Sequence, residues 1–181
     1  MKKAFYGFIF RRLLGWNTNV TTPFYKKCVI CVAPHTTNFD LFIGKVFYNA
    51  LGRKTKFMMK KEWFFFPLGI LFRAIGGIPV DRKRNTSLVE QMAQHFNECE
   101  YFHLAITPEG TRQANPQWKK GFYYIALAAQ VPIVLIGINY PTKTITSTKV
   151  IFPTGDIEKD MNEIKEYFKN FQGKHPERFA I

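Results

Sequence analysis

The first residues that could do chemistry together are His35 and Asp40, in the stretch VAPHTTNFD (32–40). The histidine follows a short apolar run that predicts a buried strand, and the aspartate falls in the first turn of the helix expected next. A strand-to-helix turn can bring the two side chains together. A carboxylate bonded to one ring nitrogen fixes the imidazole tautomer and leaves the other nitrogen free to take a proton. The pair therefore predicts a general base for a hydroxyl or similar nucleophile, with a helix cap beside a polar histidine as the structural alternative.

A second polar cluster ends the segment GGIPVDR (76–82), where Asp81 and Arg82 follow a strand-like run. An arginine in this position can bind a phosphate through two parallel hydrogen bonds. The alternative is an Asp–Arg turn at the surface, which is the better interpretation of this cluster when it is taken by itself.

The third cluster, TPEGTR (107–112), also follows a predicted strand. Gly110 permits a positive φ or a close approach of the backbone, and the backbone amides near Gly110 and Thr111 can line an anion site. Arg112 supplies positive charge, and Glu109 can orient an arginine or a substrate hydroxyl. The alternative is a Pro-Glu-Gly turn followed by a solvated arginine.

The elements that must position these clusters alternate along the chain. Apolar patterning predicts strands over 26–33, 55–59, 76–80, 101–107, 132–140 and 149–152, and helices over 38–51, 67–75, 86–98, 117–129 and 157–171. Continuous apolar strands alternating with helices predict a single α/β domain with a mostly parallel central sheet flanked by helices. Ligands of such sheets bind at the carboxyl ends of the strands, where all three clusters lie. We expect the domain to cover 21–181, after an amphipathic N-terminal segment 1–20.

The composition indicates an anionic partner. The formal net charge is +13, and aromatic residues make up 17% of the chain, with 19 Phe. Nucleic acid, a phospholipid surface and phosphorylated small molecules all fit this charge, and the composition does not choose among them. The aromatic run WFFFPLGILF (63–72) favours either contact with acyl chains or packing in the interior.

The N-terminal segment has an apolar side and flanking basic residues. As a helix it would carry Phe5, Phe8, Ile9 and Leu13 along one side. This pattern suits a helix lying in a membrane interface, or equally a helix docked on the domain's own core. No segment of the sequence reaches the roughly 20 apolar residues of a transmembrane helix.

Three cysteines do not make a disulfide framework. Cys28 and Cys31 have the C-x2-C spacing of some metal and redox sites. Their odd separation within a β-branched run, however, places them on opposite faces of a strand. The sequence therefore predicts core packing and reduced thiols, which fit a cytosolic location.

In this order, the H-x4-D pair, the glycine-rich block ending in Asp-Arg, the PEGTR segment and the strand VPIVLIGI (131–138) resemble the glycerolipid acyltransferase family. This family acylates glycerol phosphate and lysophosphatidic acid. The resemblance implies an αβ acyltransferase fold and transfer of a fatty acyl group from acyl-CoA or acyl-carrier protein to a hydroxyl of a lysophospholipid or glycerol-phosphate acceptor. It implies His35 as the base and Asp40 as its partner. It also implies acceptor binding by Arg82, Glu109, Gly110, Thr111 and Arg112.

The resemblance also sets expectations about partners. It implies no bound cofactor and no metal, with the acyl thioester as a substrate. The basic charge and the aromatic run add the expectation of a peripheral enzyme on a phospholipid membrane surface, at the cytoplasmic, inner face of the cell membrane. The chain departs from the family pattern at Pro34, Thr37 and Thr107, where asparagine, serine and phenylalanine are common. Three alternatives stay open: the same chemistry on a lyso-aminolipid or another acceptor, a hydrolase that uses His35 to activate water, and a basic nucleic-acid or membrane-binding protein without catalysis. The last leaves the motifs unexplained, so we expect no nucleic-acid partner.

Overall fold

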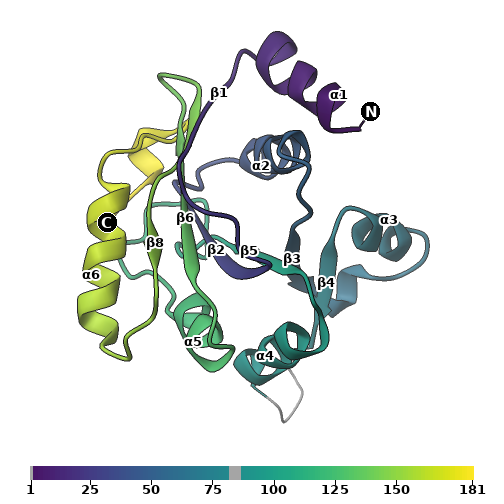
Figure 1. The fold of residues 1–181 in the computed structure, drawn as a ribbon, viewed down its shortest axis with the longest axis vertical. Helices are drawn as coiled ribbons and strands as arrows, with labels where there is room; N and C mark the ends of the chain where they lie inside the picture. Colours follow the sequence, from purple (N-terminus) through teal and green to yellow (C-terminus); the bar gives the residue numbers. More distant parts are fainter. Residues whose placement is uncertain (1, 82–86) are drawn as a thin grey trace.

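A mostly parallel sheet forms the centre of the molecule (Figure 1). The structure is a computed structural model that describes residues 2–81 and 87–181. In these residues the sheet has eight strands, with the order β1-β7-β6-β2-β5-β3-β4 and with β8 paired to β6. The strands are β1 (Asn17–Val20), β2 (Lys27–Ala33), β3 (Lys56–Lys60), β4 (Gly77–Val80), β5 (Phe102–Ile106), β6 (Ile133–Asn139), β7 (Thr144–Ser147) and β8 (Val150–Ile151). The predicted single α/β domain with flanking helices is confirmed.

Helices cover both faces of the sheet (Figure 1). The helical segments are α1 (Lys2–Phe8), the π-helical turn η1 (Ile9–Leu13), α2 (Phe39–Ala50), the 3₁₀ turn η2 (Lys61–Trp63), α3 (Leu68–Ala74), α4 (Leu88–Glu98), α5 (Gly121–Ala128), α6 (Ile157–Phe168) and the 3₁₀ turn η3 (Pro176–Arg178). Side chains of α4, α5 and α6 fill the core on one face, and those of η1 and α2 fill the core on the other.

The central strands are apolar on both faces because helices cover both. In β2, Val29 and Cys31 face the core under α4, α5 and α6, whereas Cys28 and Ile30 face the core under α2. The two cysteines therefore lie on opposite faces of the sheet, as predicted. Burial raises the pKa of the Cys28 thiol to about 12 and that of Cys31 well above its usual value.

Two edge elements and one helix start differ from the expectation. The strands β1 and β7, with the sequences NTNV and TITS, lack the apolar run that marks a buried strand and pair with each other at one margin of the sheet. Helix α5 begins at Gly121 instead of 117, because the preceding loop is held by a 2.7 Å bond from the Lys119 amide to the Pro108 carbonyl. The other predicted strands and helices are present within a few residues of their expected bounds, whereas the short turns η2 and η3 were not predicted.

The N-terminal segment packs on α2 (Figure 1). The Phe10 side chain is buried between η1 and α2, and Tyr6 and Ile9 are partly buried beside it. Phe5 and Phe8 stay exposed. The docked helix, one of the two alternatives for this segment, is therefore present, with part of its apolar surface left uncovered. Among the residues described, no helix combines the length and apolarity that a bilayer crossing requires.

The burial of Cys28 and Cys31 predicts one fast-reacting thiol per chain. Cys99, at the end of α4, is partly exposed, whereas the other two thiols are buried within the sheet. A thiol reagent needs both access and thiolate, so one equivalent should react in the folded protein and the other two only after unfolding. A Cys99→Ser variant should lose the fast phase. A fast-reacting equivalent that persists in this variant would contradict the arrangement.

Candidate active site

The carboxyl ends of β2 and β5 bring two of the predicted motifs together. These strands are parallel neighbours, with Cys31 paired to Ile106, so the turns that follow them lie side by side. The His35 amide donates a 2.7 Å hydrogen bond to Glu109 Oε1 across this edge. The strand pairing therefore joins segments that lie 74 positions apart in the chain.

The predicted His35–Asp40 contact is present. His35 Nδ1 lies 3.1 Å from Asp40 Oδ2, and the same oxygen accepts the backbone amides of Thr36 and Thr37, each at 2.9 Å. The side chain of Asp40 is 3% exposed and that of His35 is 21% exposed. Within the described residues, His35 Nε2 has no hydrogen-bond partner, so the ring nitrogen facing away from the carboxylate is available to a substrate.

Tyr140 is a further partner of Asp40 that the sequence did not reveal. It follows β6, the neighbour of β2 on the other side from β5, and its hydroxyl donates a 2.6 Å bond to Asp40 Oδ1. Burial and the contact with Asp40 raise the pKa of Tyr140, which keeps this hydroxyl a donor. Its only sequence signal is its place at the carboxyl end of a buried strand, the same edge that holds His35.

Glu109 is buried at the centre of the edge. Its side chain is 1% exposed, and Oε2 has no hydrogen-bond partner in the described part of the chain. Burial, and secondarily the charge of Asp40, raise the pKa of Glu109 to about 7, against the opposing effect of the His35 amide. A buried carboxyl oxygen without a partner is costly. Glu109 therefore either binds a donor brought by a ligand or stays partly protonated at neutral pH.

Arg112 reaches the N-terminus of α2. One of its guanidinium nitrogens, Nη1, donates to Asn38 Oδ1, three residues after His35. Gly110 adopts φ +68° and its amide donates to the Thr107 carbonyl at 3.3 Å, so the predicted tight turn is present. Thr111 is exposed on this turn, where its hydroxyl accepts the Gln113 amide at 3.2 Å.

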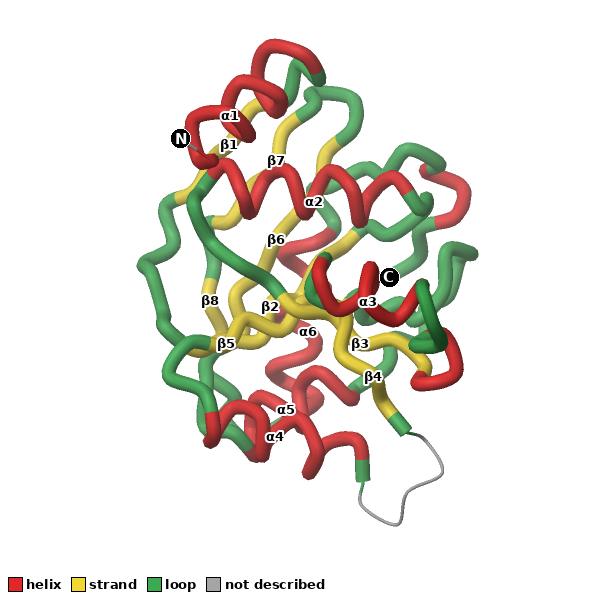
Figure 2. The backbone as a smooth tube through the Cα atoms, turned by 90° about the vertical axis from the view of Figure 1, so that its right-hand side faces the viewer, coloured by secondary structure: helices red, strands yellow, loops and turns green. Residues whose placement is uncertain are grey.

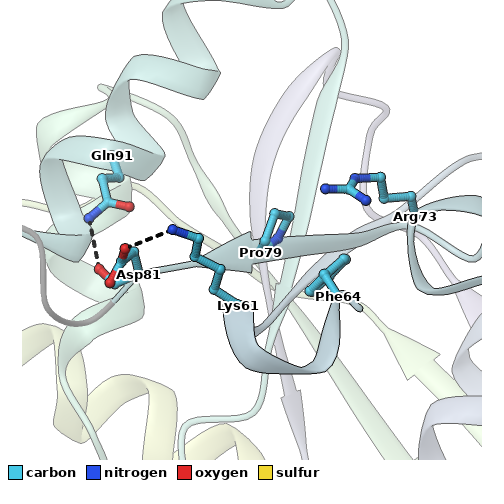
Figure 3. Close-up of a pocket in the computed structure, with 6 residues that line it drawn as sticks. All are labelled: Lys61, Phe64, Arg73, Pro79, Asp81 and Gln91. Atoms are coloured by element: carbon cyan, nitrogen blue, oxygen red, sulfur yellow. Dashed lines mark hydrogen bonds and ion pairs between the residues drawn. The ribbon is translucent and has the colours of Figure 1, made fainter. Parts of the chain in front are cut away.

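The cluster after β4 lies on the same edge, farther along the sheet. Arg82 falls outside the described residues. Asp81 bonds to Lys61 Nζ at 3.2 Å, and Figure 3 shows Lys61 extending toward it. Because β3 and β5 separate β4 from β2, Asp81 lies three strand spacings, roughly 14 Å, from the His35 strand.

A cavity of about 300 Å³ opens beside this cluster (Figure 3). Its lining residues are Lys61, Phe64, Arg73, Pro79, Asp81 and Gln91. The two cations of this lining, Lys61 and Arg73, were not identified from the sequence, because solvated cations are common in such segments. Lys61 follows the carboxyl end of β3, whereas Arg73 lies in α3, on the other side of Pro79 from Asp81 (Figure 3), so the two cations share one lining only once β3 and β4 are paired.

The C-terminal segment borders the His35 turn on the other side. The His175 amide donates to Thr36 Oγ1 at 3.3 Å, and the Tyr140 amide donates to the Gln172 carbonyl at 2.9 Å. A Cβ at Gly173 would come within 2.7 Å of the Thr36 side chain. Glycine is therefore required for the segment to pass so close to the turn.

In residues 2–81 and 87–181, no group of three or more His, Cys, Asp or Glu side chains is placed to hold a metal ion.

Comparison with known proteins identifies the family. Residues 17–139 match the family described as Acyltransferase. The chain belongs to the acyltransferase family. The match covers both clusters at the carboxyl ends of β2 and β5, together with most of the sheet.

Individual relatives of the acyltransferase chain carry more specific names. It is 29% identical over 138 residues to human 1-acyl-sn-glycerol-3-phosphate acyltransferase beta, covering 73% of this chain and 48% of that protein. It is 26% identical over 127 residues to the 1-acyl-sn-glycerol-3-phosphate acyltransferase of Escherichia coli K12, covering 67% of this chain and 51% of that protein. The chain thus spans about half the length of these relatives.

A solved structure shares the fold. The crystal structure of the 1-acyl-sn-glycerophosphate (LPA) acyltransferase PlsC from Thermotoga maritima aligns with a TM-score of 0.63 at 16% identity. The alignment covers 92% of this chain and 76% of that one. At this identity the likeness concerns the fold, and it extends beyond the family match to nearly the whole chain.

The raised pKa of Glu109 predicts a pH-dependent stability difference. Because the folded state holds this proton more tightly than the unfolded chain, the contribution of Glu109 is fully present below pH 4.5 and is lost as pH rises through about 7. Glu109→Gln keeps an acceptor for the His35 amide and does not titrate. Its unfolding free energy, relative to the wild type, should rise by about 2–3 kcal/mol between pH 4.5 and about pH 8. Denaturant titrations measure this difference, with the exposed Glu158→Gln as control. Parallel curves for wild type and Glu109→Gln would contradict the assignment.

Proposed function

We propose that the protein transfers a fatty acyl group from an acyl thioester, acyl-CoA or acyl-carrier protein, to the hydroxyl of a lysophospholipid or glycerol-phosphate acceptor. The observation that carries the proposal is the His35–Asp40 pair at the carboxyl edge of the sheet, with its second ring nitrogen open. Membership of the acyltransferase family supports the reaction class. The names of the relatives support a 1-acylglycerol-3-phosphate type of acceptor.

In the proposed mechanism His35 acts first as base and then as acid. Nε2 takes the proton of the acceptor hydroxyl as its oxygen attacks the thioester carbonyl, and Asp40 stabilises the imidazolium that forms. When the tetrahedral intermediate collapses, the carbon–sulfur bond breaks and the imidazolium returns its proton to the departing thiolate. The products are an oxygen ester and a free thiol. No residue has to be acylated on the way.

The acceptor phosphate is proposed to bind along the cationic side of the same edge. Arg112 keeps donors for it, since a guanidinium has five N–H groups and Asn38 accepts from one nitrogen. Glu109 is proposed to accept a hydrogen bond from an acceptor hydroxyl through its unpartnered oxygen, which would relieve the cost of burying it. Arg82, Gly110 and Thr111 remain proposed contributors from the sequence.

The His35 proposal predicts loss of acyl transfer without loss of the fold. Purified protein, an acyl thioester and mixed lysolipids should give an acylated lipid, identified by mass. His35→Ala should lower kcat by about 10²–10⁴-fold, the usual contribution of a general base. Tyr140→Phe leaves Asp40 its other three donors and should cost less. His95→Ala on α4 is the matched control. Free fatty acid without an acylated lipid would indicate a hydrolase instead.

The Arg112 proposal predicts loss of selectivity for a phosphorylated acceptor. A charge-assisted hydrogen bond to phosphate contributes about 1.5–3 kcal/mol, which corresponds to about 10–100-fold. Arg112→Gln should therefore lower kcat/KM for lysophosphatidic acid by about that factor, relative to uncharged monoacylglycerol. Arg11→Gln, an exposed cation on η1, serves as control. An unchanged ratio would remove Arg112 from the acceptor site.

A further inference from the structure

The segment from η2 through α3 carries a row of exposed apolar side chains, here called the aromatic ridge. Its members are Trp63, Phe65, Phe66, Ile70, Leu71 and Ile75. Phe66 is 82% exposed and Ile70 is 63% exposed. Figure 1 places α3 at the margin of the molecule beyond β4, and Figure 2, which looks onto that margin, shows α3 facing the viewer. Three of the five aromatic residues in the run 63–72, Trp63, Phe65 and Phe66, are therefore exposed and do not pack in the interior.

The ridge is not needed to hold α3 on the domain. The inner side of the segment is formed by Phe64 and Phe72, whose rings meet edge to face at 5.9 Å, and by the partly buried Leu68. A Cβ at Gly69 would lie 2.5 Å from the Phe64 carbonyl oxygen, so the helix packs directly on the preceding turn. The outer apolar side chains therefore contribute little to the fold, and their exposure is unfavourable in water.

Positive charge borders the ridge. From 60 to 75 the chain carries Lys60, Lys61 and Arg73, against one acidic residue, Glu62. Arg73 lies over the Phe64 ring at 5.2 Å, and Lys61 and Arg73 also line the cavity that extends from Asp81 past Pro79. Exposed aromatic and aliphatic side chains with adjacent cations are the pattern of surfaces that enter an anionic lipid interface.

We propose that the aromatic ridge inserts into the headgroup region of a bilayer that contains anionic phospholipid. The ridge supplies apolar area to the acyl boundary, while Lys60 and Arg73 meet lipid phosphates. Docking in this orientation would bring the cavity and the carboxyl edge of the sheet next to the membrane surface. The proposal assigns membrane contact to α3, a different element from the N-terminal helix, and it does not depend on acyl transfer, because lipid binding is measured without substrates.

Trp63 makes the contact directly measurable. Of the three tryptophans, Trp16 is 3% exposed and Trp118 is 5% exposed, whereas Trp63 is 53% exposed. Adding vesicles of equal parts phosphatidylglycerol and phosphatidylcholine should shift the fluorescence emission of Trp63 to shorter wavelength and protect this fluorescence from quenching by iodide. Pure phosphatidylcholine should give a weaker effect. Trp63→Phe should abolish the shift while cosedimentation with vesicles continues. Unchanged emission at saturating anionic vesicles would overturn the proposal.

Paired variants locate the surface. The double variant Phe66→Ser and Ile70→Ser should lower the vesicle partition coefficient at least tenfold, because each removed side chain contributes to burial in the interface. Phe152→Ser, which removes a phenylalanine that is 62% exposed elsewhere, should have little effect. Lys60→Gln should weaken vesicle binding and reduce its salt dependence. Lys26→Gln, at the amino end of β2, should change neither.

Two results would contradict the assignment. Loss of binding in Phe5→Ser with Phe8→Ser, alongside normal binding of the ridge variant, would place the contact on α1. If the wild type forms a dimer and the Phe66→Ser and Ile70→Ser variant is monomeric, the aromatic ridge contacts a second copy of the chain instead of a membrane. Unchanged circular dichroism and melting temperature establish that the ridge variant is folded. Vesicle binding without acyl transfer would leave this proposal standing and refute only the enzymatic one.

Discussion

The candidate site depends on one carboxylate. Asp40 accepts four hydrogen bonds, from the His35 ring, the amides of Thr36 and Thr37, and the Tyr140 hydroxyl. Two of these donors belong to the turn that precedes Asp40, so the carboxylate fixes the path of the chain as well as the imidazole. A buried carboxylate needs several donors, and here they come from two neighbouring strands and the turn between strand and helix. Moving any of these elements would therefore also move His35.

A second carboxylate extends this arrangement to the next strand. Glu109 receives the His35 amide on one oxygen, while its other oxygen is buried without a partner within the described residues. The contacts of Asp40 stabilise its charged form, whereas Glu109, in the turn after β5, is buried with one carboxyl oxygen unpaired within the described residues, which is unfavourable. Incomplete pairing of this kind is found at functional sites, where a ligand supplies the missing partner. The two acidic groups thus have different surroundings, since Asp40 has donors on both oxygens and Glu109 on only one within the described residues.

The sequence was sufficient for the fold and for local contacts. Strong apolar runs located β2, β5 and β6, and the turn between β2 and α2 made the His35–Asp40 contact predictable from five residues. Contacts that depend on strand order could not be predicted from the sequence. The bonds of Tyr140 to Asp40 and of His35 to Glu109 join segments 100 and 74 positions apart, and no local pattern encodes which strands become neighbours. The short polar strands β1 and β7 were missed because pairing, not hydrophobicity, defines them.

The distribution of apolar surface follows from the same topology. Helices cover both faces of the strands in the middle of the sheet, so the apolar residues of these strands are buried in the core. The connection between β3 and β4 crosses at the margin, where only its inner side finds a partner. The composition alone could not distinguish a phenylalanine in the core from one on this outer side. Because β3 ends at the same edge as β2, the part of the ridge that directly follows β3, from Trp63 to Phe66, lies toward the same edge of the sheet as the His35 turn. The proposed lysophospholipid acceptor would suit this arrangement, since its acyl chain and its phosphate require apolar and cationic surfaces in close proximity.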